Sequence, residues 1–194
     1  TLLAYEGPVI AAPGMNTAMW LNTAVQRNWK NLENNPKVLC LKPSTGLLAC
    51  DRIGDGKMVD PELIELAISS TKDLLKLNGN IKNDFKGLNL LITAGPTKEA
   101  LDPARVITNK SSGRMGVLLA QAARFRGANV QLIHGPLDLP IAWLEGIETH
   151  QIESAEEMRS LLEKFQPSSD LIVMAAAVAD LRRVGGTSKE KANK

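Results

Sequence analysis

The sequence predicts an α/β fold whose second half is a doubly wound parallel sheet. The stretch LNLLITAG (88–95) is a nearly continuous apolar run, typical of a strand that helices cover on both faces. Apolar residues at helical spacing follow at 115–126, and Gly127 is a natural end for that helix. The next run, ANVQLIHGP (128–136), again indicates a strand. A strand, a helix and a strand in this order predict a βαβ unit, from which parallel sheets are built.

The same alternation continues toward the C-terminus. IETHQI (147–152) indicates another strand, and Ser154 followed by Glu157 is a capping box that opens a helix over 154–165. DLIVMAAAVAD (170–180) then indicates a strand that ends in a turn. Because open parallel sheets bind ligands at the carboxyl ends of their strands, we expect a site in the loops after Ala94, His134 and Met174.

The first part of the chain is predicted to be a separate domain. PVIAAP (8–13) and KVLCLKP (37–43) indicate short strands, residues 17–30 have helical spacing, and the glycines of 44–58 predict a loop. Pro61 lies at a plausible first turn of a helix that extends to residue 77. Asn, Gly, Lys and Asp then dominate 76–87, where we expect a linker between a domain of residues 1–75 and one of residues 88–194.

Composition and charge exclude several function classes. Of 194 residues, 23 are Lys or Arg and 21 are Asp or Glu, so a net charge of +2 gives no electrostatic reason for nucleic acid or an anionic membrane surface. No apolar run reaches the roughly 20 residues of a bilayer span, and a cytoplasmic protein is expected. Cys40 and Cys50 have neither disulfide-framework nor zinc spacing. The chain begins with Thr and enters a strand at once, which predicts that it was taken from a longer protein.

Several residues at the expected strand ends suit a nucleotide. Gly95, and Ser111, Ser112 and Gly113 at the start of a helix, could hold phosphate through backbone N–H groups. Turn and cap roles are the alternative, because neither a GxGxxG motif nor a Walker loop is present. Asp180 could meet a ribose hydroxyl or a metal, or simply cap a helix. The lysine-rich end TSKEKANK (187–194) could be a solvated tail or a loop that folds over phosphates.

Longer motifs resemble two enzyme families of coenzyme A biosynthesis. ITAGPT (92–97), DPARVITNKSSGRMG (102–116) and MAAAVAD (174–180) resemble phosphopantothenate–cysteine ligases in order and spacing. PGMNTAMW (13–20) and STGLLACDRIGDGKM (44–58) resemble the flavin-containing phosphopantothenoylcysteine decarboxylases. Together the motifs extend over nearly the whole chain, in the order of the fused bacterial enzyme.

The decarboxylase resemblance implies that residues 1–75 are the C-terminal part of a flavodoxin-like domain that uses FMN. In that family the asparagine of the first motif, here Asn16, binds the carboxylate of phosphopantothenoylcysteine, while Met15, Met19 and Trp20 shape the pocket wall. The cysteine of the second motif, here Cys50, supplies a proton when the flavin reduces the oxidised intermediate. On their own, such Met and Trp residues more often fill a core, and a lone Cys is more often inert.

The ligase resemblance implies a Rossmann-like domain that uses CTP and Mg²⁺. Phosphopantothenate attacks the α-phosphate of CTP to give an acyl-cytidylate, and the amine of cysteine then displaces CMP. Asn109 matches an asparagine that in the family lies beside the acyl-cytidylate, with the alternative that it only satisfies backbone groups in a turn. The resemblance further implies that Lys191, or Lys189 as the alternative assignment, would cover the triphosphate and that Asp180 would meet the nucleotide or the Mg²⁺. The implied nucleotide-binding residues are Gly95, Ser111, Ser112, Gly113, Ala175, Ala176, Asp180 and Lys191.

The resemblance also implies what this chain does not contain. The flavin-phosphate loop and catalytic His of the decarboxylases match no part of it, and the ligases continue beyond the lysine loop. We therefore expect neither site to be complete in these residues. The family assembles as decarboxylase trimers and ligase dimers, so a homo-oligomer is expected. A non-catalytic regulatory or interaction module related to the flavin decarboxylases is the alternative function.

Overall fold

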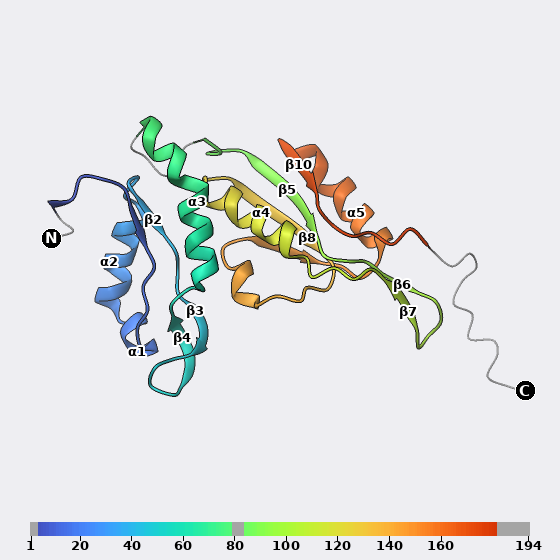
Figure 1. Cartoon of the computed structure of the whole chain (residues 1–194), viewed down its shortest axis with the longest axis horizontal. Helices are drawn as coiled ribbons and strands as arrows, with labels where there is room; N and C mark the ends of the chain where they lie inside the picture. Colours follow the sequence, from blue (N-terminus) through green and yellow to red (C-terminus); the bar gives the residue numbers. More distant parts are fainter. Residues whose placement is uncertain (1–3, 79–83, 182–194) are drawn as a thin grey trace, which may run out of the picture. The chain divides into compact units, whose positions relative to one another are not determined.

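The computed structural model describes residues 4–78 and 84–181, and Figure 1 labels many of their helices and strands. The chain divides into two compact units. The first unit comprises Thr1–Leu88, Gln121–Asn129 and Pro140–Ile147, and the second comprises Asn89–Ala120, Val130–Leu139 and Glu148–Lys194. No helix in the described ranges is both long and apolar enough to span a bilayer.

Two short parallel strands and two helices begin the first unit. The strands β1 (Val9–Ala11) and β2 (Val38–Cys40) pair in register from Val9↔Val38 to Ala11↔Cys40. The helical spacing at 17–30 is confirmed, but it belongs to two helices, α1 (Thr17–Trp20) and α2 (Thr23–Glu33). Asn22 divides them because its backbone is extended and its side chain accepts a hydrogen bond from Ala24 N, which caps α2.

The glycine-rich stretch after β2 is a hairpin rather than the expected loop. Strands β3 (Ser44–Leu47) and β4 (Ile53–Lys57) pair antiparallel, and residues 48–52 connect them. In this connection Asp51 has a positive φ of 57°, a conformation that Asp tolerates better than most residues. The expected helix is confirmed as α3 (Pro61–Asn78), with Pro61 in its first turn, and it extends into the first residues of the predicted linker.

A four-stranded parallel sheet forms the centre of the second unit, and its strands match the four predicted apolar runs. Their order is β10-β5-β8-β9, so the chain adds β8 and β9 on one side of β5 and returns to the other side with β10. Ligand sites of α/β sheets lie where the strand order reverses in this way, at the carboxyl ends of the strands. The strands are β5 (Asn89–Ala94), β8 (Asn129–His134), β9 (Glu148–Gln151) and β10 (Leu171–Met174).

The core of this unit includes a cluster of Leu91, Ile133, Ile152 and Met158, against which α5 (Ala155–Phe165) packs. The predicted capping box is confirmed: Ser154 accepts from the N–H of Glu157, whose carboxylate accepts from the N–H of Ser154. Two 3₁₀ helices, η2 (Ile141–Leu144) and η3 (Gln166–Ser168), follow β8 and α5.

The long loop after β5 contains a second hairpin that the sequence did not predict. Strands β6 (Lys98–Ala100) and β7 (Val106–Thr108) pair antiparallel. At its tip Asp102 accepts hydrogen bonds from the backbone of Ala104 and Arg105 and from the Arg105 guanidinium. The side-chain bond to Arg105 is the largest cause that lowers the pKa of Asp102 below its usual value. The aspartate is therefore ionised at neutral pH and fixes the turn.

Helix α4 (Arg114–Phe125) packs closely on β5 because Gly116 has no side chain. A Cβ at this position would lie 2.5 Å from Ala94 Cβ and 2.7 Å from the carbonyl oxygen of Thr93. Both distances are shorter than any van der Waals contact, so a larger residue forces the helix away from the strand.

Gly116→Ala is therefore expected to lower the free energy of unfolding by about 1–3 kcal/mol, although alanine is the better helix former. Urea unfolding followed by circular dichroism measures this loss. Met115→Ala is the matched control, since Met115 is 67% exposed on the same helix and its replacement leaves stability nearly unchanged. A Gly116→Ala protein as stable as the parent would contradict the close packing.

Candidate functional site

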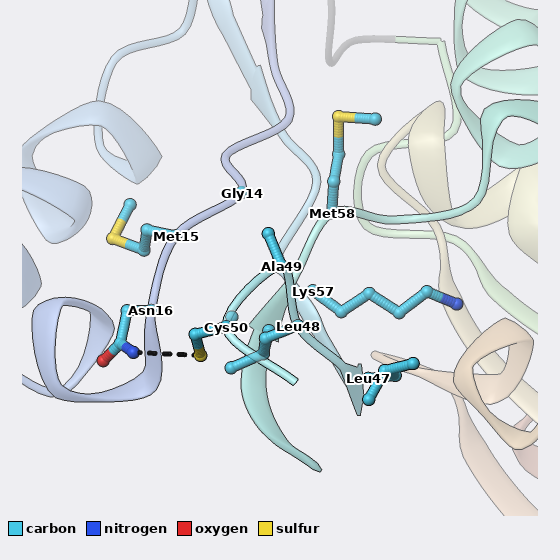
Figure 2. Close-up of a pocket in the computed structure, with 10 residues that line it drawn as sticks. Gly14, Met15, Asn16, Leu47, Leu48, Ala49, Cys50, Lys57 and Met58 are labelled. Carbon is cyan, nitrogen blue, oxygen red and sulfur yellow. Dashed lines mark hydrogen bonds between the residues drawn. The ribbon is translucent and has the colours of Figure 1, made fainter. Parts of the chain in front are cut away.

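The first unit contains a pocket of about 460 Å³ between the β1–α1 connection and the β3–β4 hairpin (Figure 2). Residues 14–16 form one side, and residues 47–50 and 56–58 of the hairpin form the other. The pocket thus combines the two stretches that resemble the decarboxylase motifs, although they lie some thirty residues apart in the sequence. Two of the expected site residues, Asn16 and Cys50, line it together.

Asn16 contacts Cys50 through a defined end of its amide. Its Oδ1 accepts a hydrogen bond from Ala18 N at 2.8 Å, which makes Asn16 the N-cap of α1. The amide nitrogen is thereby directed at the Cys50 sulfur, with Nδ2 and Sγ 3.4 Å apart (Figure 2). The pair presents an uncharged N–H donor and a thiol to the same space, which suits an anionic group and a proton transfer.

Glycines in β4 allow the hairpin to approach the β1–α1 connection. Gly56 has a φ of +120°, and a Cβ there would lie 2.2 Å from the carbonyl oxygen of Met15. Instead Met15 N donates to Gly56 O at 2.9 Å. A Cβ at Gly54 would lie 2.4 Å from the hydroxyl of Thr17. These two glycines set the distance between Asn16 and Cys50.

The walls of this pocket differ in part from those expected. Met15 lines it, but Met19 is 58% exposed and does not, while Trp20 is buried and packs edge-to-face on Trp29. Two further lining residues, Lys57 and Met58, were not predicted from the sequence.

Lys57 contributes its stem to the pocket, while its ammonium group donates to Asp60 at 3.2 Å. In Figure 2 this ammonium group points away from the Asn16–Cys50 pair. The described walls near the thiol are consequently apolar apart from the Asn16 amide.

A second candidate site lies at the carboxyl edge of the parallel sheet. The hydroxyl of Thr93, near the end of strand β5, accepts hydrogen bonds from Ala175 N and Ala176 N at 3.1 Å each. Ala177 N then donates to Gly95 O at 2.8 Å. Thr93 is fully buried, and its hydroxyl satisfies two backbone groups that the end of β10 leaves unpaired.

Asn109 and Thr97 hold the next residues of the same segment. The Asn109 amide donates to Ala177 O at 3.2 Å and to Val178 O at 3.0 Å. The Thr97 hydroxyl accepts from Ala179 N at 2.9 Å. Asn109 thus satisfies backbone carbonyl groups, as expected if it has only a structural role in a turn. It does so directly beside residues 175–176, which are expected to bind the nucleotide.

Two glycines with left-handed backbone bring three loops together at this edge. Gly95 has a φ of +73° and Gly113 a φ of +76°, and a Cβ at Gly113 would lie 3.1 Å from Gly95 N and 2.2 Å from Leu137 Cδ2. The hydroxyls of Ser111 and Ser112 accept from Gly113 N and Arg114 N, both at 3.3 Å. An anion bound here would replace these long serine bonds.

The structure therefore brings together most of the expected nucleotide-binding residues. Asp180 is exposed at the end of the segment, and the described residues contain no group of three His, Cys, Asp or Glu that could hold a metal ion. Lys189 and Lys191 lie outside the described residues. Thr93 and Thr97 were missed, although a polar residue at the end of an apolar strand could have indicated them. The residues that meet at this edge are Gly95, Asn109, Ser111, Ser112, Gly113, Ala175 and Ala176.

Comparison with known families gives two matches. Residues 85–194, more than half of the chain, match the model of the DNA/pantothenate metabolism flavoprotein C-terminal domain. Residues 1–71 match the flavoprotein family.

Curated relatives with similar sequences are bifunctional coenzyme A biosynthesis proteins. The CoaBC protein of Bacillus subtilis is 40% identical over 183 residues, which are 93% of this chain and 43% of the relative. The CoaBC protein of Escherichia coli K12 is 38% identical over 181 residues, which are 93% of this chain and 42% of that relative. The chain thus spans less than half the length of these relatives. A crystal structure of a CoaBC C-terminal domain is 42% identical, with a TM-score of 0.45 and coverage of 50% of this chain and 49% of that chain.

Thr93→Val is expected to destabilise the carboxyl edge, because it leaves two partly buried backbone N–H groups without an acceptor at a cost of about 1–3 kcal/mol. Hydrogen exchange of the Ala175 and Ala176 amides should accelerate accordingly. Thr93→Ser keeps the hydroxyl and should leave this exchange slow. Equal protection of both amides in the Val and Ser variants would show that the hydroxyl does not hold the segment.

Proposed function

This chain belongs to the family of the DNA/pantothenate metabolism flavoprotein C-terminal domain, and from that premise we propose that it acts in coenzyme A biosynthesis. Its second unit contributes to CTP-dependent ligation of 4′-phosphopantothenate with cysteine. Its first unit contributes to FMN-dependent decarboxylation of the phosphopantothenoylcysteine product to 4′-phosphopantetheine. The curated relatives, which carry the name of bifunctional coenzyme A biosynthesis proteins, support both assignments.

The observation that carries the ligase proposal is the meeting of Asn109, Gly95 and Gly113 with residues 175–179 at the carboxyl edge of the sheet. Small side chains at 175–177 let a nucleotide approach the backbone closely. Backbone N–H groups near Gly95 and Gly113 hold phosphate oxygens in this proposal. The carboxylate of phosphopantothenate then attacks the α-phosphate of CTP, and pyrophosphate leaves.

The second half-reaction joins cysteine to the activated acyl group. The amine of cysteine attacks the acyl carbonyl, and CMP leaves with the electrons of the broken mixed-anhydride bond. In this proposal the amide of Asn109, whose two N–H groups donate to Ala177 O and Val178 O in the structure, turns one of them to the oxyanion that develops on this carbonyl. In the first half-reaction Lys191, or Lys189 in its place, neutralises the triphosphate.

The carboxyl edge could hold Mg²⁺ only if the substrate phosphates supply some of its ligands. Asp180 is an exposed carboxylate, and among the described residues it belongs to no group of three His, Cys, Asp or Glu side chains that could hold a metal ion. Mg²⁺ commonly binds one or two carboxylates together with substrate phosphates and water. We therefore assign Asp180 and the CTP phosphates as its ligands.

The observation that carries the decarboxylase proposal is the contact between the Asn16 amide and the Cys50 thiol in one pocket. Asn16 donates to the substrate carboxylate without adding a charge that would oppose loss of CO₂. Cys50 holds the proton that is delivered to the product. FMN, when bound, supplies oxidation and reduction, and we assign none of the described residues to holding it.

Direct titration with CTP and Mg²⁺ tests the ligase proposal. The 194-residue chain is expected to bind CTP, and Gly113→Ala should weaken binding about tenfold or more, because it adds a side chain to a left-handed position between two loops. Calorimetry measures both affinities.

Gly87→Ala is the matched control for this titration. Gly87 has a similar φ of +83°, but no atom lies within 4 Å of the position that a Cβ would take, so its replacement should leave CTP affinity unchanged. Failure to bind CTP, both in this chain and in a complete ligase that contains it, would favour the alternative of a non-catalytic interaction module.

In a complete ligase, Asn109→Asp is expected to separate the two half-reactions. Acyl-cytidylate should still form, but its conversion to the amide should slow on the order of 10²-fold, because a carboxylate cannot donate to the oxyanion. Quenched assays count the two products separately.

The contacts of Asn109 predict a different result if its role is only structural. Its amide also supports Ala177 and Val178, so loss of that support would weaken both half-reactions together. Asn109→Ala removes the same donors without adding charge, so its difference from Asn109→Asp measures the effect of the negative charge. Equal losses in both steps for the Asp variant would refute the oxyanion role.

A further inference from the structure

Three consecutive residues of the β1–α1 region each make a hydrogen bond to the β3–β4 hairpin. Met15 donates from its backbone to Gly56 O, Asn16 from its amide to Cys50 Sγ, and Thr17 from its hydroxyl to Asp55 O. Of these three residues, Met15 and Asn16 line the pocket, whereas Thr17 does not. Thr17 therefore contacts the hairpin without a part in the proposed binding of substrate.

The bond made by Thr17 is well defined. Its Oγ1 lies 2.7 Å from the carbonyl oxygen of Asp55, a residue 38 positions later in the sequence. The hydroxyl reaches this oxygen because Gly54 has no Cβ, which would lie 2.4 Å from it. Thr17 is β-branched and follows the N-cap of α1, so its side chain has few rotamers to choose from.

The contact between Asn16 and Cys50 is weaker and depends on its surroundings. The N···S distance of 3.4 Å is long, and Cys50 lies in the exposed connection of the hairpin rather than in either strand. The ladder between β3 and β4 therefore does not fix the thiol directly. The distance is preserved only if β4 and the start of α1 stay together.

We propose that Thr17 is a positioning residue, whose bond to Asp55 O keeps the Cys50 thiol beside the amide nitrogen of Asn16. We call the bond between Thr17 Oγ1 and Asp55 O the Thr17 latch. The proposal rests on the role of Cys50 as proton donor given above. It adds a function to the Asn16 amide, which stabilises the sulfur once the proton has left.

The chemistry of the amide supports this function. When a thiol gives up its proton, the sulfur becomes negatively charged, and an N–H group pointing at it forms a charge-assisted hydrogen bond. The Asn16 amide cannot turn its oxygen toward the sulfur without losing the bond from Ala18 N that caps α1. The capping bond therefore selects the donor end of the amide for Cys50.

Alkylation of Cys50 tests the latch without flavin or substrate. In the full chain carrying Cys40→Ser, a single thiol reacts with iodoacetamide, and its rate at fixed pH follows the stability of the sulfur anion. Thr17→Val removes the hydroxyl and keeps the shape of the side chain. It is expected to slow alkylation about two- to fivefold, and Thr17→Ser is expected to retain the parent rate.

A double-mutant comparison separates the latch from a general structural effect. Asn16→Ala should slow alkylation by at least as much as Thr17→Val, and the double variant should be no slower than Asn16→Ala. A Thr17→Val protein that reacts at the parent rate would overturn the proposal. So would a double variant in which the two effects multiply, since Thr17 would then act independently of Asn16.

Gly54→Ala provides a second route to the same conclusion if Thr17→Val does not fold. Its added Cβ displaces the Thr17 hydroxyl while Thr17 itself remains, and alkylation should slow as in the Val variant. A rate equal to that of the parent would contradict the latch. Thermal unfolding of each variant establishes that the compared proteins are folded.

One further variant, Cys50→Ser, distinguishes failure of the Thr17 latch from failure of the proposed function. Cys50→Ser in the decarboxylation assay of the full-length enzyme tests the proton donor alone. Full activity of that variant would overturn the decarboxylase role of Cys50, whatever the alkylation rates show. Loss of its activity together with an unchanged rate for Thr17→Val would overturn the latch and leave the proposed function in place.

Discussion

Close approach of backbone to backbone, permitted by glycine, is the constraint on which both candidate sites depend. In the first unit Gly56 lets β4 come within hydrogen-bond distance of Met15. In the second unit Gly113 lies against Gly95, and a Cβ at Gly135 would lie inside the carbonyl group of Pro96. At each of these points a side chain would separate two loops and move the polar groups that they carry.

Threonine hydroxyl groups form hydrogen bonds with the backbone where the glycines let two segments approach closely. Where strands end, their backbone N–H and C=O groups lose their ladder partners, and threonine supplies new ones in a small volume. Thr93 accepts from two N–H groups, Thr97 accepts from a third, and Thr17 donates to a carbonyl oxygen. The chain can therefore leave its regular strands at the sites without burying unpaired polar groups.

Sequence periodicity predicted the regular elements well and the irregular ones poorly. The strands β5, β8, β9 and β10 and the capping box of α5 are confirmed because continuous apolar runs and a Ser–Glu spacing are local signals. The β3–β4 hairpin was missed because glycine has low strand propensity and here serves a contact with a distant segment. The helical spacing at 17–30 was confirmed, but the break at Asn22 was missed because apolar spacing continues through this cap.

In the candidate sites, too, local features were predicted from the sequence and contacts between distant segments were not. Strand ends and helix starts identified Gly95, Ser111–Gly113 and residues 175–176, because the carboxyl edge of a parallel sheet is a general binding position. Neither the partners of Asn109 nor the contact between Asn16 and Cys50 could be derived from spacing, since each joins residues 34 to 69 positions apart. Met19 could not be separated from Met15 because both carry the same apolar side chain in one motif.

The strand order of the second unit has a consequence for how this protein reaches its native state. The pairing of β10 with β5 joins residues about 80 positions apart, and the bonds from residues 175 and 176 to Thr93 span 82 and 83 positions. Contacts of such high sequence separation close long loops, and they are slow to form because the entropy of closure is lost before they stabilise the chain. The carboxyl edge formed by β5 and the residues after β10 is thus absent from any partly folded state that contains only β5, α4 and β8. A ligand that binds at that edge would therefore bind only after the second unit has folded completely.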